Sequence, residues 1–223
     1  MTTSIKTSPK ERKLGFRVLF LAMFAIGTGQ TLFIAVLPPY ARGLGLSEVQ
    51  VGFIFSLSAL GWMMMSPFWG RKSDFIGRKS IIILGLLVYA FTTILMGLEF
   101  RLNELEYINL STLFGLLIFT RGCYGFLGSG AHSASMAYVA DRTTENERSG
   151  VMAVMGSAFA ISGIVGPGLA SAAVMLGPLV PYFLFGFITA LIALLIFIFL
   201  PEKTKPIRLS LIHISEPTRR RTI

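Results

Sequence analysis

Four stretches of the chain, 18–37, 51–70, 80–98 and 151–200, contain no acidic or basic side chain. A helix needs roughly 20 mainly apolar residues to cross the hydrocarbon core of a bilayer. Only 14% of the 223 residues are charged, whereas a soluble domain has about a quarter. These features predict an all-α integral membrane protein with six transmembrane helices, over residues 17–40, 51–69, 80–98, 111–140, 151–176 and 179–200.

The basic residues that produce the net charge of +9 are distributed unevenly. Most precede the first predicted span or follow the second, fourth and sixth, whereas the intervening connections contain only Arg42 and Arg101. Basic residues accumulate on the cytoplasmic side of membrane proteins. The alternation predicts a multi-pass protein of the inner (cytoplasmic) membrane with both termini in the cytoplasm. The charge orients the chain in the lipid bilayer, and no nucleic-acid partner is expected.

A dense motif, Gly70-Arg-Lys-Ser-Asp74-Phe-Ile-Gly77-Arg78-Lys79, separates the second and third predicted spans. Its glycines permit close helix approach and a tight turn, and its four cations favour the cytoplasmic side. We expect a short hairpin loop here. The spacing Gly-x-x-x-Asp-x-x-Gly-Arg-Lys resembles the signature loop of the major facilitator superfamily of transporters. The resemblance implies the amino-terminal half of a twelve-helix fold, with two inverted three-helix repeats in this half.

The resemblance extends from Phe16 to about Lys205 and is strongest to the drug–proton antiporter branch. It implies a secondary transporter that exports small organic molecules by alternating access, with protons and the missing carboxy-terminal half as further partners. It implies no enzyme activity, no cofactor and no metal site. It also implies an ion pair between Arg78 and Asp141, within a cytoplasmic gate that comprises Gly70, Asp74, Gly77, Arg78, Lys79 and Asp141.

The fourth predicted span contains a cation within the membrane, Arg121. Because such a charge costs at least about 2.5–3.5 kcal/mol on insertion scales, it should face a partner or a water-filled cavity. Regular helical spacing predicts one shared face for Arg121, Gly125, Gly128, His132 and Ser135. The pattern Arg121-x-x-x-Gly125 resembles the family's fourth-helix motif, whose arginine is associated with proton coupling or substrate charge.

We expect Arg121 to line a substrate and proton pathway with Gln30 and Tyr124. The alternative is that Arg121 only ties helices together through carbonyl groups. His132 suits either a proton relay or a packing role near a helix end. Ser129 beside His132 also raises an intramembrane serine hydrolase as an alternative, although that chemistry needs a base within hydrogen-bond reach of the hydroxyl.

The fifth predicted span is rich in small residues around Gly166-Pro167, with Gly156 ten positions earlier. This pattern resembles the family's antiporter motif, whose surface meets the carboxy-terminal half; the alternative is a packing face without mechanistic meaning.

The first span contains no carboxylate. Glu99, at the outer end of the third span, is expected at the membrane interface.

The end of the chain has a different character. Residues 209–219, Leu-Ser-Leu-Ile-His-Ile-Ser-Glu-Pro-Thr-Arg, resemble the translation of a sequencing-library adaptor. We therefore expect a basic cytoplasmic tail over 1–16, a six-helix transmembrane domain over 17–205 and an artefactual tail over 206–223. A real polar tail is one alternative. A complete six-helix carrier that acts as a homodimer is another.

Overall fold

The computed structural model describes residues 8–201, and every regular element in this part of the chain is a helix. Six helical stretches are long and apolar enough to cross a membrane, which confirms the six predicted spans. The first helix already begins within the predicted basic tail, and the predicted artefactual tail lies outside the described residues. The elements are α1 (Pro9–Gly43), α2 (Glu48–Ile76), α3 (Arg78–Glu104), α4 (Leu110–Cys123), the π-helix η1 (Tyr124–Gly128), α5 (Gly130–Asp141), α6 (Glu145–Val174) and α7 (Val180–Phe199).

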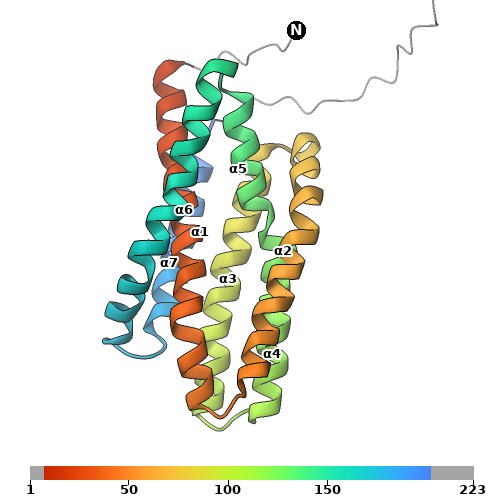
Figure 1. Ribbon diagram of the computed structural model, residues 1–223, viewed down its shortest axis with the longest axis vertical. Coiled ribbons are helices and arrows are strands. Elements are labelled where there is room, and N and C mark those ends of the chain that lie inside the picture. The colour runs from red at the N-terminus through yellow and green to blue at the C-terminus, as the bar shows by residue number, and fades with distance from the viewer. Residues whose placement is uncertain (1–7, 202–223) are drawn as a thin grey trace, which may run out of the picture.

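The helices run side by side as an elongated bundle (Figure 1). The fourth span consists of α4, η1 and α5 in succession, and it packs along α2 in the way that α6 packs along α1. Likewise, α3 contacts the fourth span and α1 contacts α7, while α3 and α7 pack on each other. Exchanging the first three spans with the last three interchanges the contacts of the first two kinds pairwise and leaves the contact between α3 and α7 unchanged. This pattern agrees with two three-helix repeats.

A single residue, Gly77, makes the turn between α2 and α3. Its φ of +107° lies in a region that glycine adopts at little cost. The α2 helix continues to Ile76 and α3 begins at Arg78. The predicted hairpin loop is therefore wrong in its extent, because most of the signature motif is helical. Gly77 fits the turn without a longer connection.

The fourth span changes helix type beside Arg121. Tyr124–Gly128 form a π-helix, whose hydrogen bonds reach one residue further than those of an α-helix. The register of the residues that follow is therefore shifted. The sequence had predicted regular α-helical spacing from Arg121 to Ser135. The π-helix interrupts this spacing. Arg121 and His132 still line one cavity, whereas Ser135 is buried and donates a hydrogen bond to the Ala131 carbonyl oxygen.

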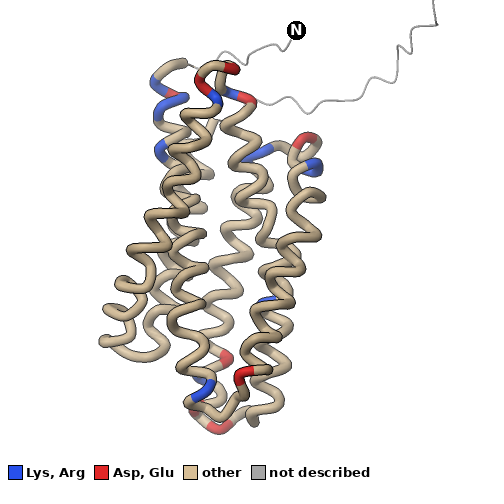
Figure 2. Tube along the Cα trace, in the orientation of Figure 1, with Lys and Arg blue, Asp and Glu red and all other residues tan. Residues whose placement is uncertain are grey.

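The outer surface of the bundle is apolar along the helices and charged near their ends. Large side chains such as Phe91, Phe119 and Phe187 are about two-thirds exposed, as expected where the surroundings are lipid. Most Lys and Arg residues gather at the end of the bundle where α2 meets α3, and few lie at the opposite end (Figure 2). This distribution follows the alternation found in the sequence.

Gly125 brings η1 against α2, and we expect this position to tolerate no side chain. A Cβ atom there would lie 3.0 Å from the Ser58 Cα and 3.1 Å from its carbonyl carbon. Backbone atoms cannot move aside without displacing α2, so Gly125→Ala should lower stability by about 1–3 kcal/mol. Gly115→Ala is the matched control, because no atom lies within 4 Å of a Cβ at that α4 position. Thermal unfolding in detergent compares the two; equal midpoints would contradict the close packing.

Candidate functional site

A cavity of about 490 Å³ lies between the helices, opens to the surface beside the exposed side chains of Ile34 and Met63, and is lined by residues of α1, α2, α4, α5 and α6. Its volume is within the range of about 300–1,000 Å³ that is typical of small-molecule sites. Three of the predicted pathway residues, Gln30, Arg121 and His132, line it. Their roles in transport stay predictions. The complete lining is Gln30, Ile34, Phe55, Ser58, Ala59, Trp62, Met63, Arg121, His132 and Phe159.

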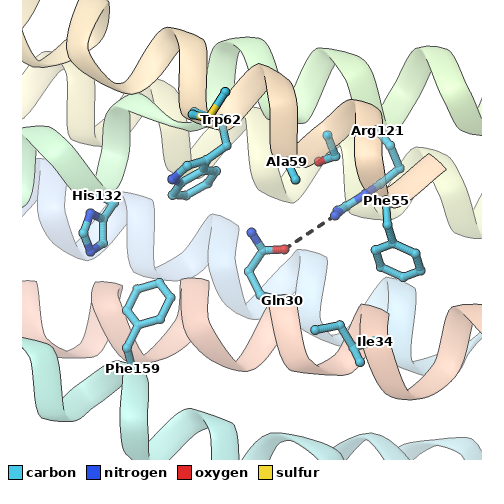
Figure 3. Close-up of a pocket in the computed structure, with 10 residues that line it drawn as sticks. Gln30, Ile34, Phe55, Ala59, Trp62, Arg121, His132 and Phe159 are labelled. Atoms are coloured by element: carbon cyan, nitrogen blue, oxygen red, sulfur yellow. Dashed lines mark hydrogen bonds between the residues drawn. The ribbon is translucent and has the colours of Figure 1, made fainter. Parts of the chain in front are cut away.

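Arg121 is the charged residue of this lining and is 3% exposed. Its Nη2 donates to the Gln30 side-chain oxygen over 3.5 Å, which is at the limit of a hydrogen bond. In Figure 3 the two side chains point toward each other across the middle of the cavity. The Arg121 Nε has no hydrogen-bond partner among the described residues. The guanidinium is thus buried with much of its hydrogen-bonding capacity unused.

Aromatic rings surround this guanidinium. Its central carbon lies 4.3 Å from the ring centre of Phe33, 4.9 Å from that of Tyr124 and 6.0 Å from that of Phe55. Such cation–π contacts stabilise a desolvated cation by about 2 kcal/mol or more. Tyr124 is 1% exposed and does not line the cavity. Its predicted position in the lining is therefore wrong: it packs behind Arg121, against Trp62 and Tyr89.

The other end of the cavity is formed by His132, Trp62 and Phe159 (Figure 3). The His132 ring centre lies 5.2 Å from that of Phe159 and 6.4 Å from that of Trp62. Three residues of this lining were not predicted from the sequence: Phe55, Trp62 and Phe159. Phe55 and Trp62 are seven residues apart, so helical spacing in the second span was a usable signal for that pair. Nothing in the sequence links Phe159 to them, because α6 meets this site only through tertiary packing.

The hydrolase alternative depends on Ser129. This residue is fully buried, and its hydroxyl has no hydrogen-bond partner within residues 8–201. The hydrogen bond from serine to a base that nucleophilic catalysis requires is therefore not formed with His132. The geometry offers no support for serine chemistry.

Glu99 is covered by the neighbouring helix. It is 3% exposed, and its Oε1 accepts a short hydrogen bond from the Thr120 hydroxyl. Its Oε2 has no partner among the described residues. This burial, which results from the packing of α3 against the fourth span, was not predicted from the sequence; the expected position at the membrane interface stays a prediction. The sequence places Thr120 beside Arg121, so the two buried ionisable groups are connected through neighbouring residues of α4.

Arg78 gathers polar groups at the end of the bundle where α2 meets α3. Its guanidinium pairs with Asp74 of α2 and with Asp141 of α5, the latter at 3.1 Å from Nε to Oδ2. Nη1 also donates to the Gly70 carbonyl oxygen, over 3.1 Å, and to the Ser73 hydroxyl. The Arg78 side chain is 11% exposed, whereas Asp74 is 40% and Asp141 32% exposed. These contacts join α2, α3 and α5, and solvent weakens the two ion pairs.

The remaining signature residue, Lys79, turns away from this cluster. Its Nζ lies 5.4 Å above the Phe197 ring of α7. Gly70 contributes its carbonyl oxygen to Arg78, and Gly77 contributes the turn. The six predicted gate residues therefore lie at one end of the bundle, but Lys79 contacts a different helix. Their function as a gate stays a prediction.

The small residues of α6 lie on two faces. Ser162 and Gly166 are buried against α1, where the Thr31 hydroxyl donates to the Ser162 carbonyl oxygen over 3.2 Å. Gly156 and Pro167 are exposed instead. A Cβ atom at Gly156 would meet no atom within 4 Å. The residues of the motif therefore have two environments. Ser162 and Gly166 pack α6 against α1, whereas Gly156 and Pro167 lie on an exposed face of α6.

The fold and the site define a multi-pass membrane protein with a cavity between its helices. The Major Facilitator Superfamily matches residues 19–220, and the chain belongs to this family. The matched range includes the segment that resembles an adaptor, so the assignment of that tail stays a prediction.

The relatives include bacterial drug-resistance proteins. The chain is 32% identical over 200 residues to "Multidrug resistance protein 2" of Bacillus subtilis, covering 90% of this chain and 47% of the relative. It is 25% identical over 189 residues to "Quinolone resistance protein NorA" of Staphylococcus aureus, covering 84% and 46%. The human organic anion transporter MFSD10 has the same fold, with a TM-score of 0.65, 24% identity and coverage of 87% and 49%. The chain spans about half the length of the relatives it matches.

Proposed function

We propose that this chain is the amino-terminal half of a secondary transporter that exports small organic molecules by alternating access. The observation that carries the proposal is the cavity around Arg121 in a chain of this family. A buried charge within a membrane protein is an indication of function. The names of the bacterial relatives, a multidrug resistance protein and a quinolone resistance protein, favour drugs as the exported molecules.

The second half of the cavity would come from the carboxy-terminal six helices of the same transporter. Transporters of this kind bind their substrate between two halves, which rock about the site. The cluster around Arg78 would act as a cytoplasmic gate. In one state its ion pairs hold α2, α3 and α5 together, and their partial exposure makes them weak enough to separate.

Proton coupling requires a group that exchanges a proton within the membrane. The first span has no carboxylate, and Glu99 is the buried carboxylate of the described residues. Its unpartnered Oε2 leaves a site for a proton. We propose that Glu99 takes this role, with Thr120 connecting it to the position beside Arg121.

Efflux by the full-length transporter tests this function. It is the protein in which residues 1–205 continue into a second half. In bacteria that lack their own pumps, its expression should lower quinolone accumulation, and a protonophore should restore accumulation. Glu99→Gln should remove the protonophore-sensitive part, whereas Glu106→Gln, in the connection after α3, should retain it. Unchanged accumulation on expression would contradict export, and full proton-dependent efflux by Glu99→Gln would contradict the role of Glu99.

We also propose that both chain termini and the Gly77 turn face the cytoplasm of an inner membrane. Cysteines introduced at Lys72 and Tyr107 test this orientation, because both positions are exposed and they flank opposite ends of α3. The native Cys123 is first replaced by serine. An impermeant thiol reagent added to intact cells should label the cysteine at Tyr107 and not that at Lys72. The reverse labelling would invert the topology.

A further inference from the structure

The charge of Arg121 is uncompensated within the described residues. Five ion pairs occur in that part of the chain, and Arg121 belongs to none of them. The cavity lining includes no Asp or Glu. The buried acid of the described residues, Glu99, accepts its hydrogen bond from Thr120 and forms no ion pair with Arg121. A buried charge without a partner is strongly unfavourable unless a counter-ion or water meets it.

The atoms around Arg121 are arranged for an anion rather than for a fixed protein partner. The rings of Phe33 and Tyr124 hold the guanidinium, and its Nε is unpartnered. The 3.5 Å contact with Gln30 is long enough for an incoming oxygen to replace it at little cost. Arginine binds carboxylates with two parallel hydrogen bonds, which makes it well suited to this group.

The rest of the cavity is suited to a flat apolar body. Phe55 lies near Arg121, whereas Trp62 and Phe159 lie at the far end, beside His132 (Figure 3). Aromatic side chains stack on ring systems with favourable geometry. A cation would meet the unscreened charge of Arg121 and no acidic group of this lining, so like-charge repulsion disfavours it.

We propose that this cavity is selective for aromatic organic anions, with the carboxylate at Arg121 and Gln30 and the ring system between Phe55, Trp62 and Phe159. The proposal rests on the proposed function, because it takes this cavity as the substrate site. It adds the substrate class: charge selectivity in this half comes from Arg121, and affinity for the ring comes from the aromatic wall.

Binding to the full-length transporter in nanodiscs of phosphatidylcholine tests the proposal without transport. Three probes of similar size differ in charge: naphthoate is an anion, naphthamide is neutral and N-methylquinolinium is a cation. Equilibrium dialysis should show naphthoate bound at least about tenfold more tightly than naphthamide, as expected for hydrogen bonds to a charged group. N-methylquinolinium should bind most weakly. Equal affinity for the three probes, tighter binding of the cation, or no binding of naphthoate to the folded transporter would overturn the proposal.

Variants locate the anion site. Arg121→Gln should reduce naphthoate affinity to that of naphthamide and leave naphthamide binding unchanged, while Arg121→Lys should retain part of the preference. Arg101→Gln is the matched control, since its side chain is 57% exposed and pairs with Glu104 outside the cavity. Circular dichroism and size-exclusion chromatography establish that each variant is folded. A naphthoate preference that survives in folded Arg121→Gln would overturn the assignment of Arg121.

The binding and transport experiments distinguish an error in the proposed function from an error in the proposed substrate class. If naphthoate binds through Arg121 but the full-length transporter exports no compound, the proposed function fails and the anion site stands. If the transporter exports cations in preference to anions, and shows no preference for naphthoate in the binding assay, the function stands and the substrate class is wrong.

Discussion

Arg121→Ala in the full-length transporter is expected to abolish efflux while leaving membrane insertion intact. The guanidinium is the charged group of the cavity lining, and no other described residue can take its place there. Loss of a hydrogen bond to a charged group reduces substrate affinity by about tenfold or more. Insertion should not suffer, because removing a buried cation saves at least about 2.5–3.5 kcal/mol on insertion scales.

Efflux rate and membrane abundance must be measured together for this variant. Arg101→Ala provides the matched control, because it removes an arginine that is outside the cavity and solvent-exposed. Arg121→Lys separates charge from shape, since lysine keeps the cation but lacks the planar guanidinium that packs between aromatic rings. Normal efflux by Arg121→Ala at normal abundance would show that Arg121 only packs helices together.

The architecture of this chain was predictable because a bilayer imposes a strong local requirement. Each span must satisfy its own backbone hydrogen bonds, so a long uncharged run becomes a helix whatever its neighbours do. The sequence also indicated a tight turn within the signature motif, because glycine adopts positive φ at little cost. The structure places this turn at Gly77, with a φ of +107°. Arg121 was found for the same reason: a cation within a long apolar run is costly wherever its partners lie.

The details of the site depend on contacts between helices, which no single stretch of sequence reveals. The position of Glu99 near the end of a span gave no sign that α4 covers it and brings Thr120 within hydrogen-bond distance. Tyr124 follows Arg121 by three residues, yet its ring packs against Trp62 and Tyr89 and does not line the cavity. The position of Phe159 depends on how α6 packs against the other helices of the bundle.

The two faces of α6 bear on whether the chain works alone. One face packs on α1, as expected for small residues that let helices approach closely. On the other, Gly156, Gly163 and Pro167 are exposed, and Cβ atoms at the two glycines would meet nothing within 4 Å. A surface of this kind suits contact with another helix. In the proposed transporter, that helix belongs to the second half.

We therefore expect that the 223-residue chain does not export drugs by itself. The cavity would lack the wall contributed by the second half, and the exposed surface of α6 would meet lipid or a second copy, giving a poorly stable protein or nonspecific dimers. The chain and the full-length transporter should be expressed at matched membrane abundance in bacteria without their own efflux pumps. Quinolone accumulation should fall only with the full-length protein. If the short chain alone lowers accumulation, and crosslinking through a cysteine at Gly163 shows a specific dimer, the half-transporter assignment is wrong and a homodimeric six-helix carrier replaces it.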